Sequence, residues 1–210
     1  MADKTQIETR AQDVTITYLQ MLQAPADKGE AVLPENARLE RVEHPTPELA
    51  RWLYSAVGGP WRWYERLTWS FQQWADELAE AGAEIWLLTV NGTPSGYCQL
   101  AAHVETSNRQ AHTETEILYF GLLENTHGQG LGRALLTAMV NRAWDLHTRH
   151  PLPPVKRVWV HTCTLDGAHA LANYQRRGFE IYGSHTEEEI IPKEPLTGWQ
   201  SMFITPADLS

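Results

Sequence analysis

The chain has 210 residues, a hydrophobic fraction of 42% and a formal net charge of −9. The apolar content predicts a packed globular protein, and the acidic charge disfavours nucleic acid as the main partner, because phosphate binding normally needs a basic face. The same charge is compatible with a cationic substrate. There is no run of about 18 apolar residues and no apolar core of a secretion signal, and Cys98 and Cys163 are too few for a disulfide framework. We therefore expect a cytoplasmic protein without a membrane span.

Strand patterns and turn signals recur along the chain. We predict a flexible tail over residues 1–12 and a loop over 24–36. Asn91-Gly92 is a strong hairpin signal, so the strands on either side of it, and the one that follows, are predicted to be antiparallel. The segments rich in β-branched and aromatic residues predict strands over 14–22, 84–90, 94–104, 113–123, 155–162, 179–183 and 199–204, with 37–43 as a strand or a loop.

Capping residues and apolar spacing predict four helices. Thr46 with Pro47 is typical of a helix start, and Ser70 with Gln73 forms a capping box. The expected limits are Thr46 to 58–60, Ser70 to near Gly82, about Gly130 to His147, and Asp166, as a cap, to Arg177 before Gly178. Two helices, an antiparallel meander and a β-α-β-α-β end predict a mixed α/β domain of the α+β type.

A glycine-rich loop, His127-Gly-Gln-Gly-Leu-Gly132, stands between a predicted strand and a predicted helix. Unpaired N–H groups at a helix N-terminus attract anions, and glycines let a phosphate approach them closely. The loop is therefore a candidate phosphate or pyrophosphate cradle, with a purely structural strand–helix junction as the alternative. It lacks the Lys-[Ser/Thr] of a P-loop, and its third glycine falls one place early for a dinucleotide fingerprint.

Residues 127–132 resemble the acetyl-CoA loop of the GNAT N-acetyltransferase superfamily, whose pattern is Arg/Gln-x-x-Gly-x-Gly/Ala. His127 stands where the family usually has Arg or Gln. A second resemblance lies downstream, where a polar residue, Ala, Tyr and Gly-Phe keep the family's relative spacing as Asp166, Ala170, Tyr174 and 178–179. The resemblance covers about residues 84–205. The wider chain is similar to a group of bacterial GNAT proteins that bring no acceptor with them.

This resemblance implies a GNAT acyl-CoA N-acyltransferase fold, with a mixed, mostly antiparallel sheet flanked by helices. It implies a single domain over residues 13–210, in which 45–82 form a helical acceptor-side region and 84–205 the acetyl-CoA-binding core. Acetyl-CoA is the implied co-substrate, without a metal. The implied partner is the amine of a small molecule or peptide, with no nucleic acid and no membrane, and a homodimer is compatible with the family's habit of dimerising.

Two residues are candidates for the catalytic chemistry. Tyr174 matches the family's tyrosine acid, which protonates the departing thiolate; an aromatic side chain packed on the sheet is the alternative. Glu116 lies six residues before Leu122, where some GNAT enzymes place a base glutamate. Because Glu114 and Glu116 share one strand face, we expect one pKa to rise toward neutrality. A solvated strand face, or a water chain acting as the base, is the alternative.

The resemblance also implies the residues that hold the co-substrate. Leu122 contributes its backbone, which bonds the pantetheine arm and polarises the thioester carbonyl. His127 is either a cationic neighbour of the pyrophosphate or a solvated loop histidine. The implied cofactor-binding residues are Leu122, Leu123, His127, Gly128, Gln129, Gly130, Leu131, Gly132, Arg133 and Asp166.

Aromatic residues between the first two helices are candidates for the acceptor pocket. Trp61, Trp63 and Tyr64 are the predicted substrate-binding residues, since aromatic rings hold apolar or cationic groups; a hydrophobic core beneath two short helices is the alternative. Three possible metal ligands also lie close together in the sequence, namely His161, Cys163 and His169. Their spacing matches no zinc pattern, and we predict no metal site.

Three functions fit these patterns. We predict an acetyl-CoA-dependent N-acetyltransferase that acts by direct attack of a primary amine in a ternary complex. The alternative is a non-catalytic acyl-CoA binding or sensing module on the same fold, since a fold alone does not specify catalysis. A nucleotide-dependent oxidoreductase is a third possibility, which the spacing of the glycines disfavours.

Overall fold

The computed structural model describes residues 7–26, 29, 31–205 and 208. The strands are β1 (Thr9–Met21), β2 (Ala37–Arg41), β3 (Glu84–Val90), β4 (Thr93–Ser107), β5 (Gln110–Leu122), β6 (Val155–Cys163) and β7 (Glu180–Pro192). The helices are α1 (Pro47–Gly58), α2 (Phe71–Ala79), α3 (Leu131–Trp144), α4 (Ala170–Gln175) and α5 (Gly198–Ser201). Short 3₁₀ turns are η1 (Gly59–Trp61), η2 (Glu65–Thr68), η3 (Glu124–Thr126) and η4 (Leu146–Thr148). Among these helices, none combines the length and apolar character that a membrane crossing requires.

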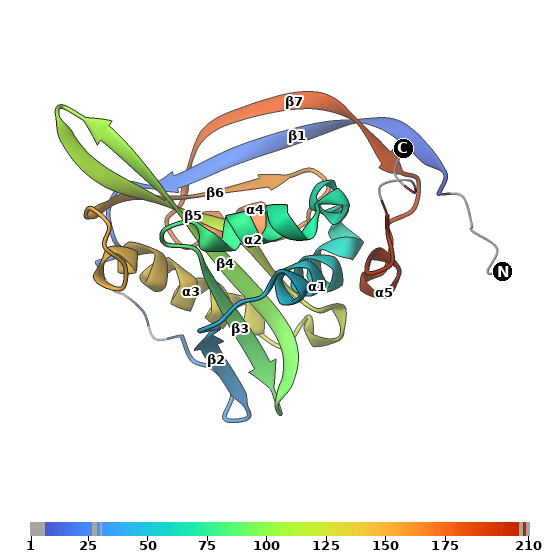
Figure 1. Ribbon diagram of the computed structural model, residues 1–210, viewed down its shortest axis with the longest axis horizontal. Helices are drawn as coiled ribbons and strands as arrows, with labels where there is room; N and C mark the ends of the chain where they lie inside the picture. Colours follow the sequence, from blue (N-terminus) through green and yellow to red (C-terminus); the bar gives the residue numbers. More distant parts are fainter. Residues whose placement is uncertain (1–6, 27–28, 30, 206–207, 209–210) are drawn as a thin grey trace.

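The strands of the described residues form one seven-stranded sheet in the order β2-β3-β4-β5-β6-β1-β7. The N-terminal strand β1 lies between β6 and β7, and β1 and β7 run side by side as the two long strands at the top of Figure 1. Within the described chain, β5 and β6 are the parallel pair and every other neighbouring pair is antiparallel. The predicted mixed, mostly antiparallel sheet with flanking helices is confirmed.

Helices lie on both faces of the sheet (Figure 1), and each face carries its own hydrophobic core. Helix α3 covers one face, where Leu135 and Met139 are fully buried, and α1 and α2 cover the other, where Leu53 and Trp74 are buried. Successive residues of a strand point to opposite faces. A side chain's parity along a strand therefore decides which of the two cores, and which side of the site, it reaches.

The predicted capping residues fold as expected. The Thr46 hydroxyl accepts a hydrogen bond from the Leu49 N–H, and Ser70 and Gln73 form a reciprocal capping box at the start of α2. Positive φ angles of 50° at Asn91 and 76° at Gly92 make the tight β3–β4 turn. These local signals set the limits of α1, α2 and the hairpin.

Two predicted segments differ at the ends of the sheet. Strand β1 begins at Thr9, earlier than predicted, because Thr9 pairs with Pro192 along the full length of β7. It takes in part of the predicted tail, whose first six residues lie outside the described ones. The strand predicted over 199–204 is wrong. Thr197 and Gln200 form a capping box there, and they start the short helix α5.

The predicted role of Asp166 as a helix cap is also wrong. Helix α4 begins at Ala170, with His169 as its N-cap. The Asp166 carboxylate instead accepts hydrogen bonds from the Thr162 hydroxyl at 2.6 Å and the Cys163 N–H at 3.1 Å. These bonds turn the chain back on the end of β6, so that Asp166 shapes the β6–α4 loop rather than the helix.

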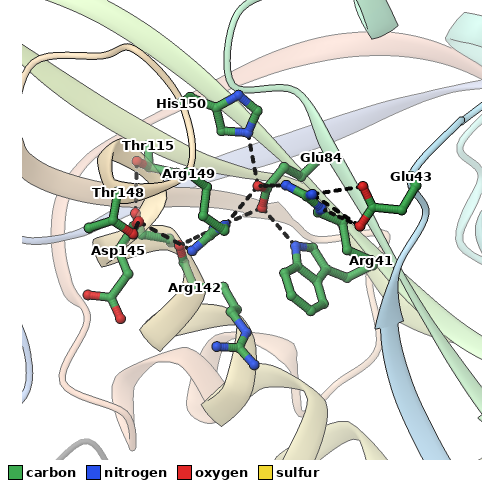
Figure 2. Close-up of polar contacts among 11 residues, drawn as sticks. Arg41, Glu43, Glu84, Thr115, Arg142, Asp145, Thr148, Arg149 and His150 are labelled. Carbon is green, nitrogen blue, oxygen red and sulfur yellow. Dashed lines mark hydrogen bonds and ion pairs between the residues drawn. The ribbon is translucent and has the colours of Figure 1, made fainter.

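A buried carboxylate fastens the sheet edge to the segment after α3. Glu84 is 3% exposed, and Figure 2 shows Arg149, His150 and Arg41 converging on it. Arg149 Nε and Nη2 donate at 2.8 Å each, and His150 Nε2 lies at 2.9 Å. Burial alone would raise the pKa of Glu84, but the hydrogen bonds from Arg149, Trp86 and His150 outweigh it and lower the pKa to about 2. The carboxylate therefore stays charged at neutral pH and links β3 to the segment after α3.

Candidate active site

The sheet divides where β5 and β6 stop pairing. Their parallel register runs from Thr113 opposite Val155 to Glu116 opposite Trp159. Beyond that point, residues 117–122 keep β4 as their paired neighbour on one side only. Backbone groups along a strand point alternately to its two sides, so half of those in 117–122 face the gap. The fork therefore turns toward the gap some backbone groups of β5 that β6 does not pair.

A cavity of about 880 Å³ occupies this fork. It is lined from both faces of the sheet, by the α1–α2 connection on one side and by the glycine loop and α4 on the other. The predicted site residues on its wall are Trp61, Trp63, Tyr64, Leu122, His127, Gly128, Gly130, Gly132, Asp166 and Tyr174. Those that do not line it are Glu116, Leu123, Gln129, Leu131 and Arg133. The fork thus gathers most of the predicted site into one cavity.

The glycine loop presents open backbone to the cavity. Gly128 and Gly130 have φ angles of +77° and +76°, and a Cβ at either position would meet nothing within 4 Å. Gly130 is also the N-cap of α3, where N–H groups lack helical partners and the helix dipole is positive. The space beside these glycines and the free amides fit an anionic group such as a pyrophosphate.

His127 connects the two sides of the cavity. Its Nε2 lies 3.1 Å from the Leu122 carbonyl oxygen, at the end of β5. Its ring stacks on Trp61, with centroids 6.1 Å apart and planes at 28°. The first position of the loop is therefore held against both β5 and the aromatic wall.

Tyr174 lies on the same side as the glycine loop. It is 7% exposed, with Phe120 and Phe179 edge-on at 6.3 and 5.9 Å. Burial, with smaller contributions from Asp166 and Cys98, raises the pKa of Tyr174 well above its usual range. The phenol keeps its proton at neutral pH, so it is able to donate one.

The other side of the cavity is aromatic and partly acidic. Trp63 packs on Tyr54 and Tyr119, at 5.5 and 6.0 Å. Tyr64 is 7% exposed; its hydroxyl donates to the Gly59 carbonyl at 3.0 Å and accepts from the Leu196 N–H at 2.8 Å. Tyr64 thus fastens the C-terminal segment as well as lining the cavity.

Two carboxylates on this side were missed in the sequence. Glu65 and Glu189 both line the cavity. Burial, followed by the charges of Glu187 and Glu65, raises the pKa of Glu189. Glu189 lies far along β7, beyond the strand predicted over 179–183, so the sequence did not place it on a strand. Arg62 and Arg66 line the cavity too, so this wall combines aromatic rings with charged side chains of both signs.

Glu116 is buried beside the fork rather than in it. It is 5% exposed, its Oε2 lies 3.0 Å from His103 Nε2, and its Oε1 lies 3.4 Å from His161 Nδ1. The expected rise of a pKa in the pair is wrong for Glu116. Burial by itself would raise the pKa of Glu116, but the contacts with His103 and His161 outweigh burial, and the pKa is lowered overall. Glu114 does not crowd it, because Arg157 neutralises Glu114 at 2.7 Å.

His161 is a further cavity residue for which the sequence predicted no catalytic or binding role. It lines the cavity and contacts Glu116, which lies 45 positions earlier in the chain. The parallel register of β5 and β6 brings them together, and no local spacing predicts that. The described residues contain no group of three or more His, Cys, Asp or Glu side chains arranged to hold a metal ion.

The family follows from a sequence comparison. A model of the acetyltransferase (GNAT) family matches residues 46–179, which is more than half of the chain. The chain therefore belongs to the GNAT acetyltransferase family. No curated protein sequence matches it significantly. The mostly antiparallel sheet also differs from the doubly wound parallel sheet that a dinucleotide-dependent oxidoreductase would use.

Solved structures share the fold at low sequence identity. A GCN5-related N-acetyltransferase from Sphaerobacter thermophilus aligns over 89% of this chain and 54% of its own, with 17% identity and a TM-score of 0.53. A tandem GNAT protein from the clavulanic acid biosynthesis pathway aligns over 83% and 53%, with 16% identity and a TM-score of 0.54. The chain thus spans little more than half the length of these structures, and the likeness concerns the fold.

Proposed function

We propose that the protein is an acetyl-CoA-dependent N-acetyltransferase that transfers the acetyl group to a primary amine of a small molecule or peptide by direct attack. The supporting observation is the cavity that occupies the fork of the sheet. Its two sides differ in chemistry. One carries the glycine loop and the Tyr174 phenol, and the other carries aromatic rings with charged side chains of both signs.

On the cofactor side, backbone groups carry out the binding. The amides of 128–132 receive the pyrophosphate, with the His127 ring beside it, and Leu123, Gln129, Leu131, Arg133 and Asp166 complete the segments that flank it. The free edge of 117–122 receives the pantetheine arm, and the Leu122 backbone orients the thioester carbonyl. When bound, acetyl-CoA supplies an activated acetyl group.

The chain's own side chains handle the protons. Tyr174 gives its proton to the departing sulfur, because its side chain lines the cavity on the same side as the glycine loop. Glu116 is the predicted base, and we propose that its carboxylate takes part in removing the proton from the amine. Since Glu116 does not line the cavity, it needs a group between itself and the amine.

On the acceptor side, we propose that Trp61, Trp63 and Tyr64 form the walls that hold the amine. Aromatic faces can hold a cation, and the carboxylates of Glu65 and Glu189 on the same wall can pair with an ammonium group, although Arg62 and Arg66 line this wall as well. An ammonium group is the form in which most primary amines arrive at neutral pH.

We further propose that residues 13–210 act as one domain, with 45–82 as the acceptor side and 84–205 as the acetyl-CoA core. The free thiols Cys98 and Cys163 favour a cytoplasmic location. A homodimer of this chain, without nucleic acid or membrane partners, is the proposed assembly.

Calorimetric titration with acetyl-CoA tests the binding, with CoA, NADH and ATP as comparison ligands. Gly130→Asp places a carboxylate in the cradle and is expected to weaken acetyl-CoA binding at least about 10-fold. Gly92→Asp is the matched control, since Gly92 has the same φ of +76° and the same open space but lies in the β3–β4 turn. Equal weakening in both variants would contradict a cradle at Gly130.

Thiol release from acetyl-CoA across a panel of primary amines then tests catalysis. Turnover with at least one amine, absent with NADH and ATP in place of acetyl-CoA, is expected. Binding of acetyl-CoA without turnover on any amine would favour the non-catalytic acyl-CoA module instead.

A further inference from the structure

His161 and Glu116 share one face of the sheet, on the acceptor side. Val160, the neighbour of His161 on β6, packs in the core beneath α3, so His161 points to the opposite face. The Thr115 hydroxyl donates to the Ala143 carbonyl of α3, so Glu116 also points away from α3. Tyr174 belongs to the α3 side. A base at His161 and an acid at Tyr174 would therefore act from opposite faces of the fork.

Of the two partners of Glu116, His161 is the one that reaches the cavity. The side chains of His161 and His103 are 43% and 44% exposed, and each contacts a different oxygen of Glu116. His161 lines the cavity, whereas His103 and Glu116 do not. Because Nδ1 of His161 faces the carboxylate, Nε2 is the ring nitrogen left to take a proton from a bound molecule.

Among the described residues, Glu116 is the carboxylate in direct contact with the His161 side chain. From β1, Tyr18 lies 6.2 Å away between ring centroids, and His185 of β7 stacks on Tyr18 at 5.8 Å. From β6 itself, Trp159 lies at 6.4 Å. Arg157, on the same strand, is paired with Glu114. The Glu116 carboxylate is therefore the charged group placed to orient the His161 ring.

We infer that His161 is the general base that removes a proton from the acceptor amine, and that Glu116 is a positioning residue which acts through it. This inference rests on the proposed acetyltransferase function. The arrangement places a carboxylate behind an imidazole and a substrate in front of it, which is how a carboxylate holds a basic histidine in the required tautomer. The distance between His161 Nδ1 and Glu116 Oε1 is 3.4 Å, which is long for a hydrogen bond. Catalytic hydrogen bonds are often long in the absence of substrate and shorten when it binds.

The proton balance is as follows. His161 Nε2 takes one proton from the acceptor ammonium, and the freed nitrogen lone pair forms the N–C bond while the C–S bond breaks. The Tyr174 hydroxyl gives its proton to the sulfur, and the second amine proton, lost on amide formation, restores it. His161 then releases the first proton to solvent. One ammonium and one thioester thus give one amide, one thiol and one proton.

Three variants test the role of His161, with thiol release from acetyl-CoA measured on the amines that the wild type acetylates. His161→Ala is expected to lower kcat about 100-fold with little change in the KM for acetyl-CoA, and added imidazole is expected to restore part of the loss. His103→Ala is the matched control, because it removes the other partner of Glu116 at equal exposure but not the cavity wall, and kcat should stay within a few-fold. Glu116→Gln is expected to lower kcat about 10-fold, and to add little in the His161→Ala background.

A second readout does not depend on turnover. Long-range ¹H–¹⁵N NMR of the imidazoles at pH 8 should find the proton of His161 on Nδ1 and that of His103 on Nε2, because these atoms face Glu116. Glu116→Gln should remove this preference in His161.

The outcomes separate the two proposals. A wild type that acetylates amines while His161→Ala keeps its kcat, or a His161 ring with its proton on Nε2, overturns the role of His161 and leaves the acetyltransferase function standing. A wild type that binds acetyl-CoA but acetylates no amine overturns both.

Discussion

Glu84 and Glu116 are both buried carboxylates on strands of the same sheet, with 3% and 5% exposure, but their partners differ. Glu84 is held by two guanidinium groups, an imidazole and an indole, and it lies in the closed part of the sheet. Glu116 is held by two half-exposed imidazoles, at the last residue where β5 and β6 pair.

This difference distinguishes a carboxylate that stabilises the fold from one that can take part in catalysis. The Glu84 cluster lies away from the cavity, and its two arginines stay protonated at any pH that the protein meets, so it serves as a structural charge. Histidine changes charge near neutrality, so the Glu116 cluster can exchange protons with a substrate. Changes in the closed part of the sheet should therefore reduce stability and leave the chemistry intact, whereas changes at the fork should do the reverse.

The largest effect is expected at Glu84. Its pKa is lowered from 4.5 to about 2, so its charge stabilises the fold fully above pH 4.5, and this contribution disappears as the pH falls toward 2. Glu84→Gln is expected to lose on the order of 3 kcal/mol of unfolding free energy at neutral pH. Urea denaturation from pH 7 to pH 3 measures this, and the variant's stability should depend less on pH.

Glu116→Gln is the matched comparison for Glu84→Gln. Its two imidazole partners remain half exposed and are solvated by water, so it is expected to lose only about 1 kcal/mol of unfolding free energy. Equal losses of stability at the two positions would remove the distinction between the closed and forked parts of the sheet.

An intermediate effect is expected at Tyr174, on the cofactor side of the fork. Tyr174→Phe keeps the buried ring between Phe120 and Phe179, so the melting temperature should hardly change. Without the phenol proton, kcat should fall about 100-fold. Steady-state kinetics beside a thermal melt measures both quantities. An unchanged kcat would make Tyr174 a packing residue and leave the departing sulfur without its proposed acid.

The smallest effect is expected at His127. Its ring lies beside the proposed pyrophosphate site, so His127→Gln is expected to weaken acetyl-CoA binding by about two- to fivefold. Calorimetric titration of the two proteins measures this change. If the affinity is the same in the variant, His127 only links Leu122 to Trp61.

Much of the fold could be predicted from the sequence because its signals are local. The capping residues Thr46 and Ser70 and the Asn91-Gly92 turn act through neighbours within three residues, and each of these elements is confirmed. The misplaced elements have tertiary causes or overlooked signals. Pairing with β7 extends β1 to Thr9, and the Thr197 capping box makes α5 helical, where the aromatic 199–204 segment had predicted a strand.

The sequence by itself determined the glycine loop, the positions of most helices and strands, and the family resemblance, because these depend on residue types at short, regular spacings. Only the tertiary structure decided where β5 and β6 separate, and hence which predicted residues share a cavity. It also decided that Glu116 meets His103 and His161, 13 and 45 positions away, rather than Glu114 beside it. Proton affinities depend on distance and burial in three dimensions, and strand register sets both.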